Sequence, residues 1–140
     1  MTVLLDAGAL VTALSPSQPG HERMVEALER DTAQLVLSPL VLAEVDYFLL
    51  RYGGVAQELR FLGELAAERY VLAPFDSGDV LEAAAIIERY RDLRIGLADA
   101  SIVVLAGRHR TNRVLTLDER HFRALRTPAG EKFTILPADA

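Results

Sequence analysis

The sequence predicts an α/β protein with a mainly parallel central sheet and helices on both faces of that sheet. Short apolar runs typical of buried strands alternate along the chain with segments of helical spacing, and this alternation indicates βαβ crossovers. The length of 140 residues and the 51% of hydrophobic residues fit one domain over residues 1–140 with a sizeable core.

Apolar runs predict the strands. The first run, TVLL, ends at the charged residue Asp6 and is followed by the small residues Ala7 and Gly8. This is the pattern of a buried strand that leaves its sheet at a turn. The predicted strands are Thr2–Leu5, Gln34–Leu37, Tyr70–Leu72, Arg113–Leu117 and Phe133–Leu136.

Apolar residues at helical intervals predict helices between the strands. Ser38 followed by Pro39 marks a helix start, because serine caps the first turn and proline is favoured at the first helical position. Gly53 and Gly54 predict the end of that helix at about Tyr52 and the start of another. The predicted helical segments are 10–14, a stretch around 24–28, 39–52, a stretch around 59–65, a helix that begins at 76 or 77, and 97–106.

The composition excludes several kinds of site and segment. Without cysteine the chain has no disulfides and no thiolate metal site, so a metal ion would need oxygen or imidazole ligands. The apolar start lacks the basic segment of a signal peptide, and Asp6 interrupts it. No stretch approaches the roughly 20 uncharged apolar residues of a membrane span, so we expect a cytoplasmic protein.

The net charge of −5 hides an asymmetry along the chain. Residues 1–107 hold 8 basic and 16 acidic residues, whereas residues 108–140 hold 7 and 4. Arginine suits bidentate phosphate contacts, so the basic part is a candidate surface for nucleic acid. The alternative is a solvated surface in a protein that uses arginine in place of lysine. The residues considered for RNA contacts are Arg110, Arg113, Arg120 and His121.

Acidic residues are predicted to meet at the carboxyl ends of the strands, where parallel sheets bind their ligands. Asp6 and Asp118 follow the first and fourth predicted strands, and Asp99 lies in the first turn of a helix. Glu44 lies inside a helix among apolar neighbours, so its carboxylate needs a partner or an ion. Converging carboxylates repel one another unless a cation such as Mg²⁺ or Mn²⁺ intervenes. The pattern is typical of a metal-dependent nuclease.

Each of these acids also has a structural interpretation. Asp6 and Asp118 suit turn or helix-cap positions, and Asp99 complements a helix dipole. Glu44 suits an ion pair with an arginine. The combination of all four favours the catalytic interpretation.

The order and spacing of four segments resemble those of the motifs of PIN-domain ribonucleases. The segments are VLLDAGALV, SPLVLAEVDYFL, RIGLADASIVVLA and VLTLDERHF. From Thr2 to about Pro137 the chain looks most like the VapC toxins of bacterial toxin–antitoxin (VapBC) systems. The resemblance implies a Rossmann-like three-layer α/β/α sandwich, a homodimer and a Mg²⁺- or Mn²⁺-dependent endoribonuclease. It assigns the catalytic and metal-binding roles to Asp6, Glu44, Asp99 and Asp118.

The resemblance also implies a substrate and a partner. VapC toxins cleave structured RNAs of the translation machinery, typically tRNA or a ribosomal RNA loop, and a VapB-type antitoxin inhibits them. The first motif departs from the family pattern, because Ala7 and Gly8 stand where hydroxyl or amide side chains are common. We expect activity with weaker metal binding, and Thr116 offers a hydroxyl near Asp118.

Other functions fit the sequence less well. A phosphatase of the haloacid dehalogenase type needs a second aspartate at the position of Gly8. A receiver domain needs an acidic pair at the first strand and a late lysine in the sheet. His121 as a general acid is unnecessary where a metal ion activates water. The alternative that stays open is a catalytically silent PIN-fold module that acts through protein binding.

Overall fold

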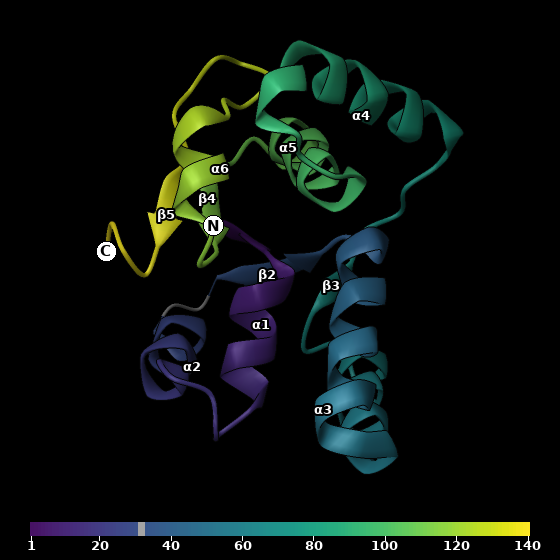
Figure 1. The fold of residues 1–140 in the computed structure, drawn as a ribbon, viewed down its shortest axis with the longest axis vertical. Helices are drawn as coiled ribbons and strands as arrows, with labels where there is room; N and C mark the ends of the chain where they lie inside the picture. The colour runs from purple at the N-terminus through teal and green to yellow at the C-terminus, as the bar shows by residue number, and fades with distance from the viewer. Residues whose placement is uncertain (31–32) are drawn as a thin grey trace.

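A parallel sheet with the strand order β3-β2-β1-β4-β5 forms the centre of the molecule (Figure 1). The structure is a computed structural model that describes residues 1–30 and 33–140. All neighbouring strands of this sheet are parallel, as the alternation of strands and helices predicts. The strands are β1 (Thr2–Leu5), β2 (Gln34–Leu37), β3 (Val71–Leu72), β4 (Arg113–Leu115) and β5 (Thr134–Leu136).

β1 lies between β2 and β4, and the direction in which the chain builds the sheet reverses there. The chain runs outward from β1 to β2 and β3, and then returns to β4 on the other side of β1. Leu5 pairs with Leu115 across β1 and β4, and the backbone N–H of Asp6 donates to the Leu115 carbonyl at 3.0 Å. Ligands of open α/β sheets bind at such a reversal, beyond the carboxyl ends of the strands.

Helices cover both faces of the sheet, which gives three layers (Figure 1). Helices α1, α2 and α3 lie on one side, and α4 and α5 lie on the other. No helix in the described part of the chain is both long and apolar enough to cross a membrane. The helices are α1 (Ala7–Leu14), α2 (His21–Glu29), α3 (Pro39–Ala66), α4 (Ser77–Arg89), α5 (Leu97–His109) and α6 (Glu119–Ala124), with a 3₁₀ turn η1 (Arg91–Leu93).

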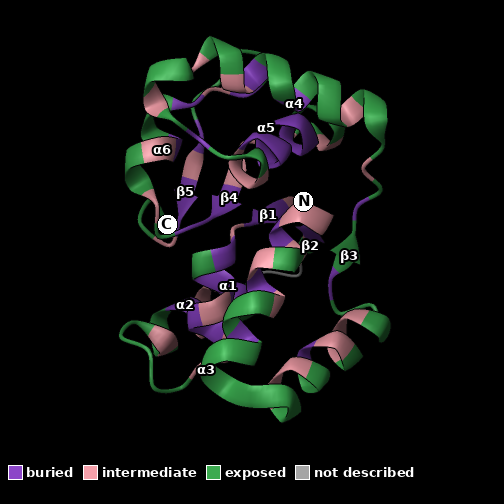
Figure 2. Cartoon of the chain, turned by 45° about the vertical axis from the view of Figure 1, so that its right-hand side comes forward, coloured by how far each residue is buried: buried purple, intermediate pink, exposed green. Residues whose placement is uncertain are grey.

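The core lies between the sheet and its inner helices. In α5 every residue from Ala100 to Ala106 is buried, because this helix packs against both β1 and α4 (Figure 2). The start of α5 is tied to the start of α3 by a buried hydrogen bond of 2.7 Å between the hydroxyls of Ser38 and Ser101. This bond holds together the two helix ends that carry Glu44 and Asp99.

The structure agrees with the predicted break at the glycine pair and differs from the prediction after β4. α3 comprises two helical segments joined at a kink, because Gly54 leaves the helical conformation, with φ 80° and ψ 175°, as the glycine pair predicts. β4 ends at Leu115, two residues before the predicted end, and the chain then enters α6. With six residues α6 is too short to show a periodic pattern.

Aromatic side chains on α3 are more exposed than expected for core residues. Tyr47, Phe48 and Tyr52 are 56%, 38% and 71% exposed. They are therefore not part of the core of this chain.

Candidate active site

Asp6 directly follows β1 and caps α1. Its Oδ1 accepts a hydrogen bond of 2.9 Å from the backbone N–H of Ala7. Its Oδ2 accepts one of 2.6 Å from the hydroxyl of Thr116. The capping role that the sequence offered as an alternative is therefore real, but it occupies only one of the two carboxylate oxygens.

Asp118 lies beyond β4, next to Asp6. Its backbone N–H donates to the Thr116 hydroxyl at 2.9 Å, so one buried threonine contacts both acids. The Asp118 side chain caps α6 by accepting from the backbone N–H of His121 at 3.0 Å. The two acids that follow the adjacent strands β1 and β4 thus lie at the same edge of the sheet.

Asp99 reaches this edge from the first turn of α5. Its Oδ2 lies 2.8 Å from Nδ1 of His121, and the same Nδ1 lies 2.9 Å from Oδ2 of Asp118. The side chains of Asp99 and Asp118 are 16% and 36% exposed, and that of His121 is 20% exposed. An imidazole nitrogen therefore stands between two carboxylates in a partly buried setting.

Glu44 comes from the first part of α3, on the other side of the sheet from α5. It is half-buried, and burial raises the pKa of its carboxyl, with a further contribution from the charge of Asp6. The structure thus places Glu44 within electrostatic reach of Asp6. Among the residues that the structure describes, none forms a hydrogen bond or an ion pair with the Glu44 side chain.

Burial and mutual repulsion make the charged state of these acids costly. Burial raises the pKa of Asp99 to about 6, and the charge of Asp6 adds to the shift. Burial also raises the pKa of Asp6, although the hydrogen bonds from Thr116 and Ala7 oppose the rise. A cation would relieve this repulsion.

The donor set suits a divalent cation. Within residues 1–30 and 33–140, one group of potential ligand atoms lies within 4.8 Å of one another, and it comprises Asp99, Asp118 and His121. Asp6 is linked to this group by Thr116, whose hydroxyl contacts both the Asp6 carboxylate and the backbone of Asp118. Carboxylate oxygens are preferred by Mg²⁺ and Mn²⁺, so the residues present fit such an ion.

The residues considered for RNA contacts lie in two places. Arg120 is exposed on α6, beside Asp118 and His121. Arg110 caps the far end of α5, roughly 16 Å along the helix axis from Asp99 at about 1.5 Å per residue. Arg113 begins β4, at the opposite end of that strand from Asp118, and contacts Met1. The structure therefore brings Arg120 and His121 to the acids and leaves Arg110 and Arg113 away from them.

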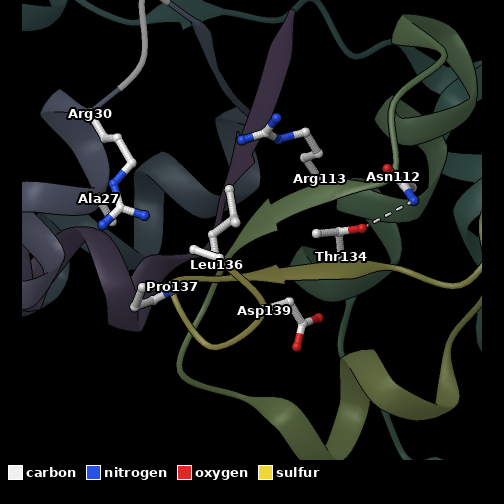
Figure 3. Close-up of a pocket in the computed structure, with 9 residues that line it drawn as sticks. Ala27, Arg30, Asn112, Arg113, Thr134, Leu136, Pro137 and Asp139 are labelled. Atoms are coloured by element: carbon white, nitrogen blue, oxygen red, sulfur yellow. Dashed lines mark hydrogen bonds between the residues drawn. The ribbon is translucent and has the colours of Figure 1, made fainter.

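A cavity of about 410 Å³ is lined by residues of β4, β5 and α2 (Figure 3). Its charged lining residues include Arg30 and Asp139, which form ion pairs with Glu26 and Arg123. None of the four acids lines it. It therefore adds nothing to the candidate active site.

Two roles in the site could not be assigned from the sequence. Thr116 was a candidate for a nearby hydroxyl, and the structure shows its bond to Asp6. His121 was considered for RNA or acid–base chemistry, but not as a direct partner of Asp99. The available signal was the spacing of Asp118 and His121, because residues three apart share one face of a helical turn.

Comparison with known proteins identifies close and distant relatives. Residues 3–127 match the PIN domain family. Over 135 residues the chain is 42% identical to ribonuclease VapC26 of Mycobacterium tuberculosis, which covers 96% of this chain and 100% of that protein.

Two solved structures illustrate the likeness of the fold. VapC20 of Mycobacterium tuberculosis, a sarcin–ricin loop cleaving toxin, has a TM-score of 0.74 at 12% identity, over 80% of this chain and 86% of that chain. VapBC2 from Rickettsia felis, bound to a DNA fragment from its promoter, has a TM-score of 0.67 at 19% identity, over 96% and 98% of the two chains. At these identities the structures show a shared fold.

Proposed function

The chain belongs to the PIN-domain family and is a homologue of a VapC ribonuclease, and from this premise we propose that it is a metal-dependent endoribonuclease of the toxin type. The observation that carries the proposal is the convergence of Asp6, Asp99 and Asp118 at one edge of the sheet, with Glu44 in electrostatic reach. The expected cofactor is Mg²⁺ or Mn²⁺. It would be held by these acids.

The chain's own residues prepare the site for phosphodiester hydrolysis. When bound, the ion supplies Lewis acidity toward the phosphate and toward the attacking water. Thr116 fixes one oxygen of Asp6, and the backbone of α6 fixes one oxygen of Asp118. Ser38 and Ser101 hold the starts of α3 and α5 together. The carboxylates are therefore oriented before an ion or a substrate arrives, which reduces the cost of assembling the site.

The proposed substrate is a structured RNA of the translation machinery, a tRNA or a ribosomal RNA loop. The relation to a VapC ribonuclease supports this choice. The exposed Arg120 beside Asp118 is placed to contact phosphate. His121 is the second proposed RNA contact at this edge. Contacts of Arg110 and Arg113 with RNA stay a prediction that would require an RNA reaching the other end of α5.

The proposed protein partners are a VapB-type antitoxin and a second copy of this chain. Solved structures of similar fold include VapBC complexes. The exposed apolar side chains of α3, among them Tyr47, Tyr52 and Leu59, would be buried in such an assembly. A homodimer predicts that Tyr52→Glu shifts the purified chain to a lower mass in sedimentation. An unchanged mass would exclude this part of α3 from the dimer contact.

Cleavage of RNA by the purified protein tests the function. With Mn²⁺ or Mg²⁺ we expect cutting of total RNA at a restricted set of sites, mapped by sequencing of the new ends, and none with EDTA. Asp6→Asn and Asp99→Asn should each reduce cutting by more than about 100-fold, beyond the usual effect of a residue that only supports a metal site. Asp92→Asn, an exposed aspartate on η1, is the matched control and should cut normally.

Two outcomes would contradict the proposal. Unchanged cutting by Asp6→Asn or Asp99→Asn would remove these residues from catalysis. Absence of cutting together with absence of stabilisation by Mn²⁺ would identify the chain as a catalytically silent PIN-fold module.

A further inference from the structure

We propose that His121 is a direct nitrogen ligand of the divalent ion and that it makes the site prefer a transition-metal ion such as Mn²⁺ over Mg²⁺. The inference rests on the proposed function, because it concerns the ion of the same site. It adds a fifth protein ligand, of a different chemical type, to the four carboxylates.

The first argument is the position of Nδ1. This nitrogen lies 2.8 Å from an oxygen of Asp99 and 2.9 Å from an oxygen of Asp118. Neighbouring ligand atoms of a six-coordinate ion lie roughly 3 Å apart when each is about 2.1 Å from the metal. Nδ1 therefore already has the spacing of a neighbouring ligand toward each carboxylate oxygen, and the three ligand atoms all lie within 4.8 Å of one another.

The second argument is that the backbone of His121 is held in place, by its own N–H and by the residue that follows it. The backbone N–H of His121 donates to Oδ1 of Asp118, which fixes the first turn of α6. The next residue, Phe122, is fully buried and packs edge-on against Phe133 with ring centroids 5.4 Å apart. These contacts hold the His121 backbone at the edge that carries the acids, and the contacts of Nδ1 with Asp99 and Asp118 place the ring between them.

The third argument concerns the choice of ion. Mg²⁺ favours oxygen ligands almost exclusively, whereas first-row transition metals bind imidazole well. A site with one nitrogen among its ligands therefore loses little affinity for Mn²⁺ and more for Mg²⁺. The prediction is a preference for Mn²⁺ that depends on one side chain.

Pulsed electron paramagnetic resonance of the Mn²⁺-loaded protein tests for the nitrogen directly. The chain has three histidines, and the other two, His21 and His109, lie at the start of α2 and in the last turn of α5. A tag-free His21→Gln/His109→Gln variant keeps His121 as its single imidazole. We expect ¹⁴N coupling to Mn²⁺ in this variant and its loss in His121→Asn.

Thermal stability at increasing metal concentration gives a second readout that needs no RNA. In His121→Asn the concentration of Mn²⁺ for half-maximal stabilisation should rise by on the order of tenfold or more. The corresponding Mg²⁺ concentration should change much less. The His21→Gln/His109→Gln variant should keep the wild-type ratio between the two ions.

The outcomes separate this inference from the proposed function. If Mn²⁺ binds and RNA is cut but no ¹⁴N coupling is present, the imidazole leaves the acids when the ion arrives, and the inference is wrong while the ribonuclease stands. An equal change for Mn²⁺ and Mg²⁺ in His121→Asn would also overturn it. If neither ion binds the wild-type protein, both proposals fail.

Discussion

The hydroxyl of Thr116 donates a hydrogen bond of 2.6 Å to Oδ2 of Asp6, across the pair of strands β1 and β4. The same hydroxyl accepts from the backbone N–H of Asp118 at 2.9 Å. The first motif lacks hydroxyl side chains, because Ala7 and Gly8 follow Asp6. A threonine from a distant part of the sequence therefore supplies the side-chain hydrogen bond to Asp6, whereas the first motif contributes the backbone N–H of Ala7.

Removal of that hydroxyl should weaken the site. Thr116→Val leaves the Asp118 N–H and one oxygen of Asp6 without their partner, at a cost of about 1–3 kcal/mol in the free energy of unfolding. The affinity for Mn²⁺ should fall by roughly tenfold, because Asp6 is no longer oriented. Denaturant unfolding and metal titration measure the two effects. Thr116→Ser keeps the hydroxyl and should retain most of the affinity, and equal losses in both variants would show that the methyl group matters instead.

The raised pKa of Asp99 predicts how stability depends on pH in the metal-free protein. The pKa of about 6 lies above the ordinary value of 3.8, so the folded chain binds more protons than the unfolded chain between these values. Its free energy of unfolding should therefore fall as the pH rises through this window. Full ionisation of Asp99 should lower the free energy of unfolding by on the order of 3 kcal/mol.

Comparison with Asp99→Asn isolates this effect from other titrating groups. In EDTA the stability of the variant relative to the wild type should increase as the pH rises from about 4.5 to about 7.5. The reason is that the variant lacks the Asp99 carboxylate, whose ionisation destabilises the wild type. Saturating Mn²⁺ should reverse the order, since only the wild type binds the ion fully. A difference in stability between the two proteins that is the same at both pH values would contradict the raised pKa.

The salt dependence of RNA binding should distinguish the two groups of arginines. In an Asp6→Asn background that does not cut, Arg120→Gln should reduce the slope of log affinity against log salt by about 1, as for one lost phosphate contact. Arg110→Gln removes the same charge at the far end of α5 and should leave the slope unchanged. Equal effects of both variants would indicate that the RNA extends along α5.

The kink of α3 should depend on Gly54. Its φ of 80° and ψ of 175° lie in a region that side chains other than that of glycine rarely enter. Gly54→Ala should cost about 1–3 kcal/mol in the free energy of unfolding. Gly63 lies in the same helix with open space around its Cα, so Gly63→Ala should instead stabilise by up to about 1 kcal/mol. Equal effects of the two substitutions would argue against a strained position at residue 54.

The sequence predicted the parallel sheet and its first two strands because these depend on local patterns. β1 and β2 begin and end as predicted. Each is a short apolar run that ends directly before a polar residue, Asp6 or Ser38, and this pattern predicts a strand with a defined end. The break within α3 also follows from a local pattern, since the glycine pair predicts it and Gly54 leaves the helical conformation there.

Within the site, the meeting of the acids at one edge followed from the rule for parallel sheets. The contact between Asp99 and His121 did not, because it joins α5 to α6, and no pattern in the sequence predicts α6. The bond between Thr116 and Asp6 likewise depends on strands that are 110 residues apart. Contacts of this kind become visible only when the tertiary structure is known.

The pairing of β1 with β4 has a consequence for a chain that is still being synthesised. Asp6 is made 110 residues before Thr116, so the site is incomplete until β4 and the residues that follow it have been added. Any truncated product that stops before β4 lacks Thr116, Asp118 and His121, whatever the fold of its remaining part. Under the proposed function, chains that end before Asp118 should therefore not cut RNA, and activity should begin only once β4 and α6 have been made.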